Sequence, residues 1–360
     1  MVSTSIYFVH NILRIELFLH RFGFETHDAV VHGLWTRNYK SMLDQVKELK
    51  FNVLRIPFCN ENLISGTVAK SIDFNKNSDL VGLSSLETLD KIVAYSGSIG
   101  LRILLDRHSS KAGNFLNEPL WYIQGDAYYT EERFVADWVM LAKRYRGTAV
   151  IGADLWNEPK SANGVTATWG TGDASTDWNS AAERAGNAIL AANPDWLIIV
   201  EGTALNTWWG GNLMGVETNP IVLQVSNKVV YSIHEYSQGV YDQPWFSDPS
   251  FPMNLRPRWD SFWGYLFRTQ TAPLLIGEFG TNFKFPNDAI WLPILLNYMA
   301  GQLMEDGQST LLEGQQGMSW TFWCLNPNSG DTGGILLDDW VTVDTLKMSF
   351  LSPMLALSLP

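Results

Sequence analysis

The sequence predicts an α/β protein, built as a single (β/α)8 barrel of the TIM type over 360 residues. Apolar segments of strand length alternate with segments of helical periodicity, which is typical of a parallel sheet with crossover helices. Polar and aromatic residues follow the apolar segments directly, where a barrel carries its active site. The chain length is one that such barrels reach as one domain.

Eight apolar segments account for the eight strands of the barrel. We expect strands at 13–22, 51–58, 101–106, 150–156, 197–201, 229–234, 273–277 and 317–323. Helical periodicity predicts helices at 39–50, 86–98, 131–145, 178–192, 258–269, 289–304 and 343–355. The interval between 201 and 229 lacks an obvious helix. Residues 303–316 are expected to form a surface excursion before the last strand.

The domain organisation is expected to be simple. Without a linker-like stretch or a short-period repeat, we expect residues 1–360 to form one domain with no appended module. Residues 1–22 are an atypical N-terminal strand or cap region. Polar residues interrupt their apolar pieces, so neither a signal peptide nor a membrane span is convincing there.

Charge and composition restrict the ligand. A net charge of −12 disfavours nucleic acid and anionic membranes, so we expect a neutral or cationic ligand. We also expect a monomer. The chain has 16 tryptophans, many of them in Gly-, Asn- and Ser-rich segments where burial in a core is a weak explanation. Such loop tryptophans are suited to stacking on sugar rings.

The two cysteines favour neither a disulfide nor a metal site. Cys59 and Cys324 follow the second and eighth predicted strands, so their separation is expected to be about 9 Å or more. A disulfide requires Cα atoms within about 7 Å, and we therefore expect free thiols. With no C-x-x-C spacing, structural zinc is excluded, and we expect no metal and no organic cofactor.

Two glutamates at predicted strand ends suggest cleavage of an acetal. Glu158 ends the apolar run of 150–156, and Glu278 ends the run of 273–277. Two carboxylates about 5 to 5.5 Å apart give a retaining glycosidase, whereas a spacing of about 6.5 Å or more gives an inverting one. Arg55, at the end of the second strand, could keep Glu278 charged. The residues alone leave open which carboxylate is the nucleophile.

Six ordered motifs at strand ends resemble a known family, the family 5 glycoside hydrolases, and most closely its bacterial endo-1,4-β-glucanases. The resemblance runs from 23 to 353 and is carried by Arg55-Ile56-Pro57, Asp106-Arg107-His108, Asn157-Glu158-Pro159, His234-Glu235-Tyr236, Gly277-Glu278-Phe279-Gly280 and Trp320-Thr321-Phe322-Trp323.

The resemblance implies a role for each matching residue. Glu158 would be the acid/base and Glu278 the nucleophile. Asn157 would bind the sugar 2-hydroxyl, while Arg55 and Tyr236 would hydrogen-bond the nucleophile. His108 and His234 would line the site of the cleaved bond, and Trp323 would lie under the sugar at subsite −1.

Other candidates depend on context. A second Asn-Glu-Pro, at Asn117-Glu118-Pro119, follows no strand and is interpreted as an ordinary loop. Asp154 and Glu235 are expected to have supporting or solvent roles, and Glu201 is not assigned to the chemistry. The segment 326–334 is interpreted as a rigid loop at the cleft edge. Further sugar contacts are expected from residues in loops: Trp208, Trp209, Trp35, Trp169 and His32.

The predicted function is a retaining endo-1,4-β-glucanase that acts on cellulose or other β-1,4-glucans. Another β-glycanase activity, such as β-mannanase, xyloglucanase or lichenase, is an alternative because the carboxylates determine the reaction and not the sugar. A non-catalytic glycan-binding barrel is a further alternative. An extracellular location is expected because the polymeric substrate lies outside the cell.

Overall fold

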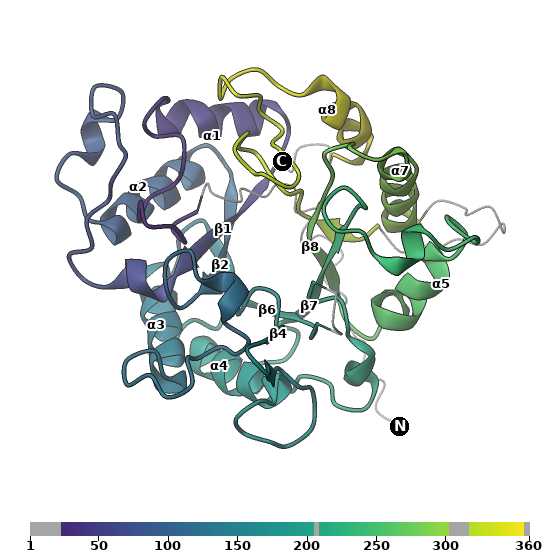
Figure 1. Cartoon of the computed structure of the whole chain (residues 1–360). Helices are drawn as coiled ribbons and strands as arrows, with labels where there is room; N and C mark the ends of the chain where they lie inside the picture. Colours follow the sequence, from purple (N-terminus) through teal and green to yellow (C-terminus); the bar gives the residue numbers. More distant parts are fainter. Residues whose placement is uncertain (1–22, 205–208, 302–316, 356–360) are drawn as a thin grey trace, which may run out of the picture.

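The computed structural model describes residues 23–204, 209–301 and 317–355. Seven parallel strands form one curled sheet in the order β1-β2-β3-β6-β7-β8-β9, surrounded by helices (Figure 1). The strands are β1 Val53–Cys59, β2 Arg102–Ser109, β3 Val150–Asp154, β6 Leu197–Glu201, β7 Val229–Tyr236, β8 Leu274–Gly280 and β9 Ser319–Trp320. A short hairpin of β4 (Ser161–Ala162) and β5 (Val165–Thr166) follows β3. The predicted barrel is confirmed.

At both ends of this sheet, pairing extends beyond the named strands. The predicted strand 13–22 lies outside the described residues. Phe24, just after it, forms a parallel bridge with Phe58 of β1 and donates its N–H to the carbonyl of Pro57 at 2.6 Å. The last strand is shorter than predicted, but Trp323 still donates its N–H to the carbonyl of Phe279 at 2.8 Å. Pairing therefore continues up to the strand-end residues.

The helices follow the strands in the predicted order. The longer ones are α1 Tyr39–Glu48, α2 Ser85–Ser98, α3 Glu131–Arg144, α4 Trp178–Ala192, α7 Pro286–Ala300 and α8 Thr345–Leu351. The predicted helix 258–269 is a composite of α5 Leu255–Trp259, a π-helical turn at Asp260–Gly264 and α6 Tyr265–Arg268. Short 3-10 turns lie at Asn60–Leu63, Ser78–Leu80, Phe115–Asn117, Met214–Glu217, Pro244–Phe246 and Ser352–Met354.

Between β6 and β7 the described residues contain only the turn Met214–Glu217, as expected from the missing helical pattern. The predicted excursion at 303–316 falls entirely outside the described residues. Helix starts follow from local chemistry: at α2, Ser84 and Glu87 form a reciprocal capping box. None of the described helices combines the length and apolar character needed to cross a membrane.

Two apolar layers support the site. The larger layer lies between the sheet and the helices. The smaller layer fills the barrel interior and consists of Val53, Leu104, Ile199, Val230 and Leu275. Side chains two positions apart along a strand point to the same face. Arg55, Asp106 and Glu201 each follow a residue of the smaller layer by two positions and therefore also point into the barrel. The polar site therefore lies directly above an apolar plug.

A register shift in β8 brings Glu278 to the same inner face. Ile233 pairs with Ile276, but the next residue of β7, His234, pairs with Glu278, so Gly277 is skipped. A Cβ at Gly277 would lie 2.4 Å from Oγ of Ser232, which explains the glycine. A bulge of this kind re-aims a side chain. Without it, Glu278 would point toward the helices.

Candidate active site

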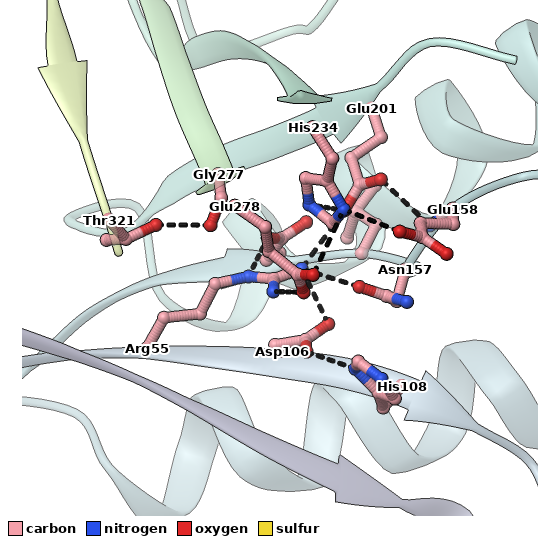
Figure 2. Close-up of polar contacts among 12 residues, drawn as sticks. Arg55, Asp106, His108, Asn157, Glu158, Glu201, His234, Gly277, Glu278 and Thr321 are labelled. Carbon is pink, nitrogen blue, oxygen red and sulfur yellow. Dashed lines mark hydrogen bonds and ion pairs between the residues drawn. The ribbon is translucent and has the colours of Figure 1, made fainter. Parts of the chain in front are cut away.

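The guanidinium of Arg55 is the centre of the candidate site, and it is fully buried. Its Nη1 donates to Glu278 at 2.7 Å, and its Nη2 lies 3.0 Å from Glu201 and 3.0 Å from Asp106 (Figure 2). Its Nε donates to Asp154. One permanently charged cation thus faces four carboxylates from different strands. Buried charges of this kind require such pairing.

Glu158 lies just beyond β3 in a left-handed backbone conformation, with a φ of 49°. Its N–H donates to Oε2 of Glu201 at 2.8 Å, which ties this unusual backbone to β6. Its Oε1 lies 3.0 Å from Nδ1 of His234, and its Oε2 lies 3.9 Å from Nζ of Lys160. The carboxyl group is therefore placed between an imidazole and an ammonium group.

Glu278 is held by two donors on separate oxygens. Oε1 accepts from Arg55, and Oε2 accepts from the Tyr236 hydroxyl. His234 lies close to both acids, since its Nδ1 is 3.4 Å from Oε2 of Glu278. One carboxylate oxygen of Glu158, one of Glu278 and a nitrogen of His234 all lie within 4.8 Å of one another. This short spacing agrees with the close carboxyl groups of a retaining pair.

The two acids and His234 have strongly shifted pKa values. Burial raises the pKa of Glu278 to about 8, against the opposing charges of His234 and Arg55. Burial also acts to raise the pKa of Glu158, but the hydrogen bond and charge of His234, together with Lys160, outweigh it and lower the pKa to about 2. Burial acts to lower the pKa of His234, yet Glu201 and Glu278 raise it well above its usual range.

These shifts place a proton on His234 and leave Glu158 ionised, the reverse of what a proton donor at Glu158 requires. The raised pKa of Glu278 likewise favours its protonated form, and Arg55, His234 and Tyr236 act against this by favouring the carboxylate. The hydrogen bond between His234 and Glu158 resolves the difference at Glu158. Moving the proton from Nδ1 of His234 to Oε1 of Glu158, across 3.0 Å, converts an imidazolium and a carboxylate into an imidazole and a carboxylic acid. The two groups therefore share one proton and titrate as a unit.

The cluster suits acid–base chemistry better than metal binding. Two sets of residues have ligand-like spacing: Glu158, His234 and Glu278 form one, and Asp106, His108 and Glu278 form the other. Both include Glu278, whose oxygens already accept from Arg55 and Tyr236. A dication there would face the guanidinium of Arg55 at close range, which is unfavourable.

His108, Trp323 and Asn157 also belong to the cluster. Nδ1 of His108 lies 2.7 Å from Asp106, and burial lowers the pKa of His108 to about 3, which keeps the ring neutral. The rings of His108 and Trp323 stack with centroids 5.9 Å apart. The amide oxygen of Asn157 accepts from Arg55 at 3.2 Å, which orients its NH2 group as a donor.

The loop tryptophans that were expected to contact sugar lie in different places relative to the candidate site. Trp208 lies outside the described residues. Trp209 adjoins the site, because its carbonyl accepts the N–H of His234 at 3.1 Å and its ring lies 5.2 Å from that of Tyr236. Trp169 packs elsewhere: its indole N–H donates to the carbonyl of Asn219, and its ring lies beside Tyr231. Neither of these partners belongs to the cluster.

Trp35 and His32 lie on the loop that follows Phe24. Trp35 is 38% exposed, and its ring contacts those of Trp340 and His32 edge-on at 5.1 and 5.3 Å. His32 is mostly buried, lies 3.0 Å from the hydroxyl of Thr26 and reaches Asn328 at 3.4 Å. It thus links this loop to the loop 326–334. Sugar contact by Trp35 and His32 stays a prediction.

Several acidic residues have roles that differ from or add to the predicted ones. Glu118, in the second Asn-Glu-Pro, accepts from Ser110, Lys111 and Asn114 of its own loop, in agreement with its interpretation as a loop residue. Glu235 faces the helices and accepts from Trp259. Glu201 was not assigned to the chemistry, but it contacts Arg55, His234 and Glu158. Its position at a strand end was the only signal in the sequence.

Cys59 and Cys324 are both buried and free, as predicted. The loop 326–334 is braced by the buried Lys347, whose Nζ donates to the carbonyls of Thr332 and Gly334, each at 2.8 Å. The segment is thus held by a lysine contributed by α8, in agreement with the rigid loop that was predicted.

Comparisons with known proteins point in one direction. The family described as cellulase (glycosyl hydrolase family 5) matches residues 17–329. An endoglucanase of Paenibacillus polymyxa is 46% identical over 92% of this chain and 81% of its own length. The major extracellular endoglucanase of Xanthomonas campestris pv. campestris is 40% identical over 92% of this chain and 65% of its own length.

A solved structure supports the same relationship. The endocellulase of Pyrococcus horikoshii in complex with cellotetraose superposes with a TM-score of 0.83 and 40% identity, over 95% of this chain and 92% of that one. The two proteins therefore share both the barrel fold and, over nearly the whole chain, a similar amino-acid sequence. The chain belongs to the cellulase family, glycosyl hydrolase family 5, as its strand-end motifs predicted.

Proposed function

We propose that the protein is a retaining endo-1,4-β-glucanase in which Glu278 is the nucleophile and Glu158 the acid/base. The observation that carries this proposal is the short spacing of the two carboxylates, within 4.8 Å through their nearest oxygens, together with their different partners. Glu278 accepts from two donors, Arg55 and Tyr236, that favour a carboxylate. Glu158 shares a proton with His234.

In the first step, an oxygen of Glu278 attacks the anomeric carbon while the bond from that carbon to the leaving oxygen breaks. Glu158 gives its proton to the leaving oxygen, so the departing glucan leaves as an alcohol. In the second step, water attacks the anomeric carbon, Glu158 takes a proton from the water, and the bond to Glu278 breaks. Two inversions give net retention.

The remaining residues bind the sugar in this scheme. The NH2 group of Asn157, oriented by Arg55, would donate to the 2-hydroxyl, where hydrogen bonds strengthen in the transition state. Trp323 would lie under the sugar at subsite −1, beside His108. Trp209, next to Tyr236, would contact the leaving-group side.

A β-1,4-glucan is the proposed substrate because the relatives described above carry the name endoglucanase and the Pyrococcus endocellulase is seen with cellotetraose. A β-mannanase, xyloglucanase or lichenase activity remains the alternative, and initial rates on a panel of these polysaccharides distinguish them. The intact set of acids, donors and cations argues against a binding-only barrel. An extracellular location is proposed by analogy with the Xanthomonas relative. The single domain and the monomeric state stay predictions.

Trapping with azide tests the two roles separately. With Glu278→Gly and an activated β-cellobioside carrying a good leaving group, azide would occupy the space of the nucleophile and give an α-glycosyl azide. With Glu158→Gly, the covalent intermediate would still form, and azide would attack it to give a β-glycosyl azide. The opposite pair of anomers by NMR would reverse the roles, and release of α-anomeric product by the wild-type enzyme would exclude retention.

A further inference from the structure

Glu201 is a buried carboxylate that contacts three members of the candidate site at once. Its Oε2 accepts the backbone N–H of Glu158 at 2.8 Å. Its Oε1 lies 3.1 Å from Nε2 of His234 and 3.0 Å from Nη2 of Arg55. Figure 2 shows it above these residues, reaching both the backbone of Glu158 and His234. It has no exposed surface, so it is not placed to bind substrate.

The contact with Glu158 acts on the backbone. A glutamate at a φ of 49° occupies a region that non-glycine residues rarely adopt and that needs support from its surroundings. A charge-assisted hydrogen bond from the Glu158 N–H to Glu201 supplies this support. It fixes the direction in which the Glu158 side chain leaves the chain.

The contact with His234 acts on the proton. Because Oε1 of Glu201 lies 3.1 Å from Nε2 of His234, the negative charge of this carboxylate favours the forms of the ring in which Nε2 carries a hydrogen. When the ring is neutral, Nδ1 is then an acceptor, and a hydrogen bond to Glu158 requires the proton to be on the carboxyl group. The tautomer favoured by Glu201 is thus the one that leaves Glu158 as an acid.

We propose that Glu201 is a positioning residue for the acid/base: it holds the backbone of Glu158 and favours the Nε2–H tautomer of His234, which remains after Nδ1 has given its proton to the Glu158 carboxyl group. This inference rests on the proposed function, and it adds a residue that lies outside the set that the sequence motifs assigned. Glu201 acts through Glu158 and His234 and does not contact the reacting atoms.

The variant Glu201→Gln tests this role with almost no change in shape. An amide has one acceptor oxygen and one NH2 group, so it cannot accept from the Glu158 N–H on one side and from Arg55 on the other, and it carries no charge beside His234. One of the two contacts must become a clash between donors. The matched control is Glu235→Gln, which makes the same change at a buried glutamate that faces the helices.

The readout is the dependence on the leaving group. Cleavage of cellotetraose needs a proton donor, whereas 2,4-dinitrophenyl β-cellobioside releases a phenolate that needs none. For Glu201→Gln we expect kcat/KM to fall by about 100-fold or more on cellotetraose and by less than about tenfold on the dinitrophenyl substrate. The basic limb of the kcat/KM profile should move to lower pH, since His234 loses a neighbouring anion. Glu235→Gln should follow the wild type on both substrates.

Equal losses on the two substrates, or activity on cellotetraose close to wild type, would overturn the role of Glu201. The proposed function is tested by separate arms: it fails if the wild type leaves cellotetraose intact, or if Glu158→Gln loses activity on both substrates equally. With those arms as expected, the result for Glu201→Gln concerns Glu201 alone.

A second variant covers the case in which Glu201→Gln does not fold. A Cβ at Gly210 would lie 2.5 Å from Oε2 of Glu201, the oxygen that accepts from Glu158. Gly210→Ala therefore displaces this oxygen while keeping its charge, with some added strain because Gly210 has a φ of 64°. We expect a smaller loss with the same preference for the dinitrophenyl substrate. A loss that is equal on both substrates would count against the proposal.

Discussion

Replacing Lys160 by methionine should move the basic limb of the pH profile upward. Nζ of Lys160 lies 3.9 Å from Oε2 of Glu158, and its side chain is only 13% exposed. As a cation it favours the ionised form of Glu158 and so helps to lower the pKa of that acid. Methionine can keep the packing on the ring of Phe115, over which Nζ lies at 4.7 Å, without the charge.

The size of the effect follows from the distance. Two unit charges about 4 Å apart interact by about 4 kcal/mol at an effective dielectric constant of about 20, and by about 1 kcal/mol in water. Lys160 lies between these limits because its side chain is partly exposed. Since one pKa unit corresponds to about 1.4 kcal/mol, we expect the limb to move up by about 1 to 2 pH units.

The assay is kcat/KM on cellotetraose as a function of pH, with Lys160→Arg as the charge-preserving control. The proton shared by His234 and Glu158 should be retained to higher pH in Lys160→Met, so activity should extend into more alkaline solution. In Lys160→Arg the limb should stay near that of the wild type. A Lys160→Met profile that coincides with the wild type, or that moves to lower pH, would refute this electrostatic reasoning.

Three other variants address different parts of the molecule. Tyr236→Phe removes a donor to Glu278, which raises the pKa of that carboxyl group, so the acid limb of kcat/KM should move to higher pH; an unchanged acid limb would contradict this. Glu118→Gln should keep cellotetraose hydrolysis within about threefold of wild type, because among the described residues its carboxylate accepts hydrogen bonds from its own loop; a loss comparable to that of Glu158→Gln would contradict the assignment. Burial raises the pKa of Glu235 from 4.5 to about 7. The contribution of this group to the free energy of unfolding of the wild type should therefore be greatest below pH 4.5 and should fall as the pH rises toward 7. Glu235→Gln should remove up to about 3 kcal/mol of this dependence in denaturant titrations across that range, and an identical pH dependence in both proteins would contradict it.

The sequence was sufficient for the features that depend on local pattern. Glu158 and Glu278 could be found because each follows an apolar run, and the second Asn-Glu-Pro could be set aside because no strand precedes Glu118. The missing helix before β7 was also evident from the periodicity.

Features that depend on pairing between strands were not predictable. The register shift at Gly277 is a property of β7 and β8 together, and one chain segment alone does not reveal it. Glu201 was passed over because its partners include a backbone N–H that becomes accessible only through the left-handed conformation of Glu158. Trp169 was predicted to contact sugar because it lies in a loop. Its contacts with Asn219 and Tyr231 join segments far apart in the sequence, so the loop alone does not reveal them.

The position of Arg55 also has a consequence for assembly of the fold. The first part of the barrel contributes Arg55 from β1 with Asp106 and Asp154 from β2 and β3, and the later part contributes Glu201 and Glu278 from β6 and β8. In a half-assembled barrel, these last two carboxylates would lack their guanidinium partner. The charge balance of the site is therefore complete only when both parts of the barrel are in place. We expect heat inactivation to follow the same transition as global unfolding, with no earlier melting confined to the site.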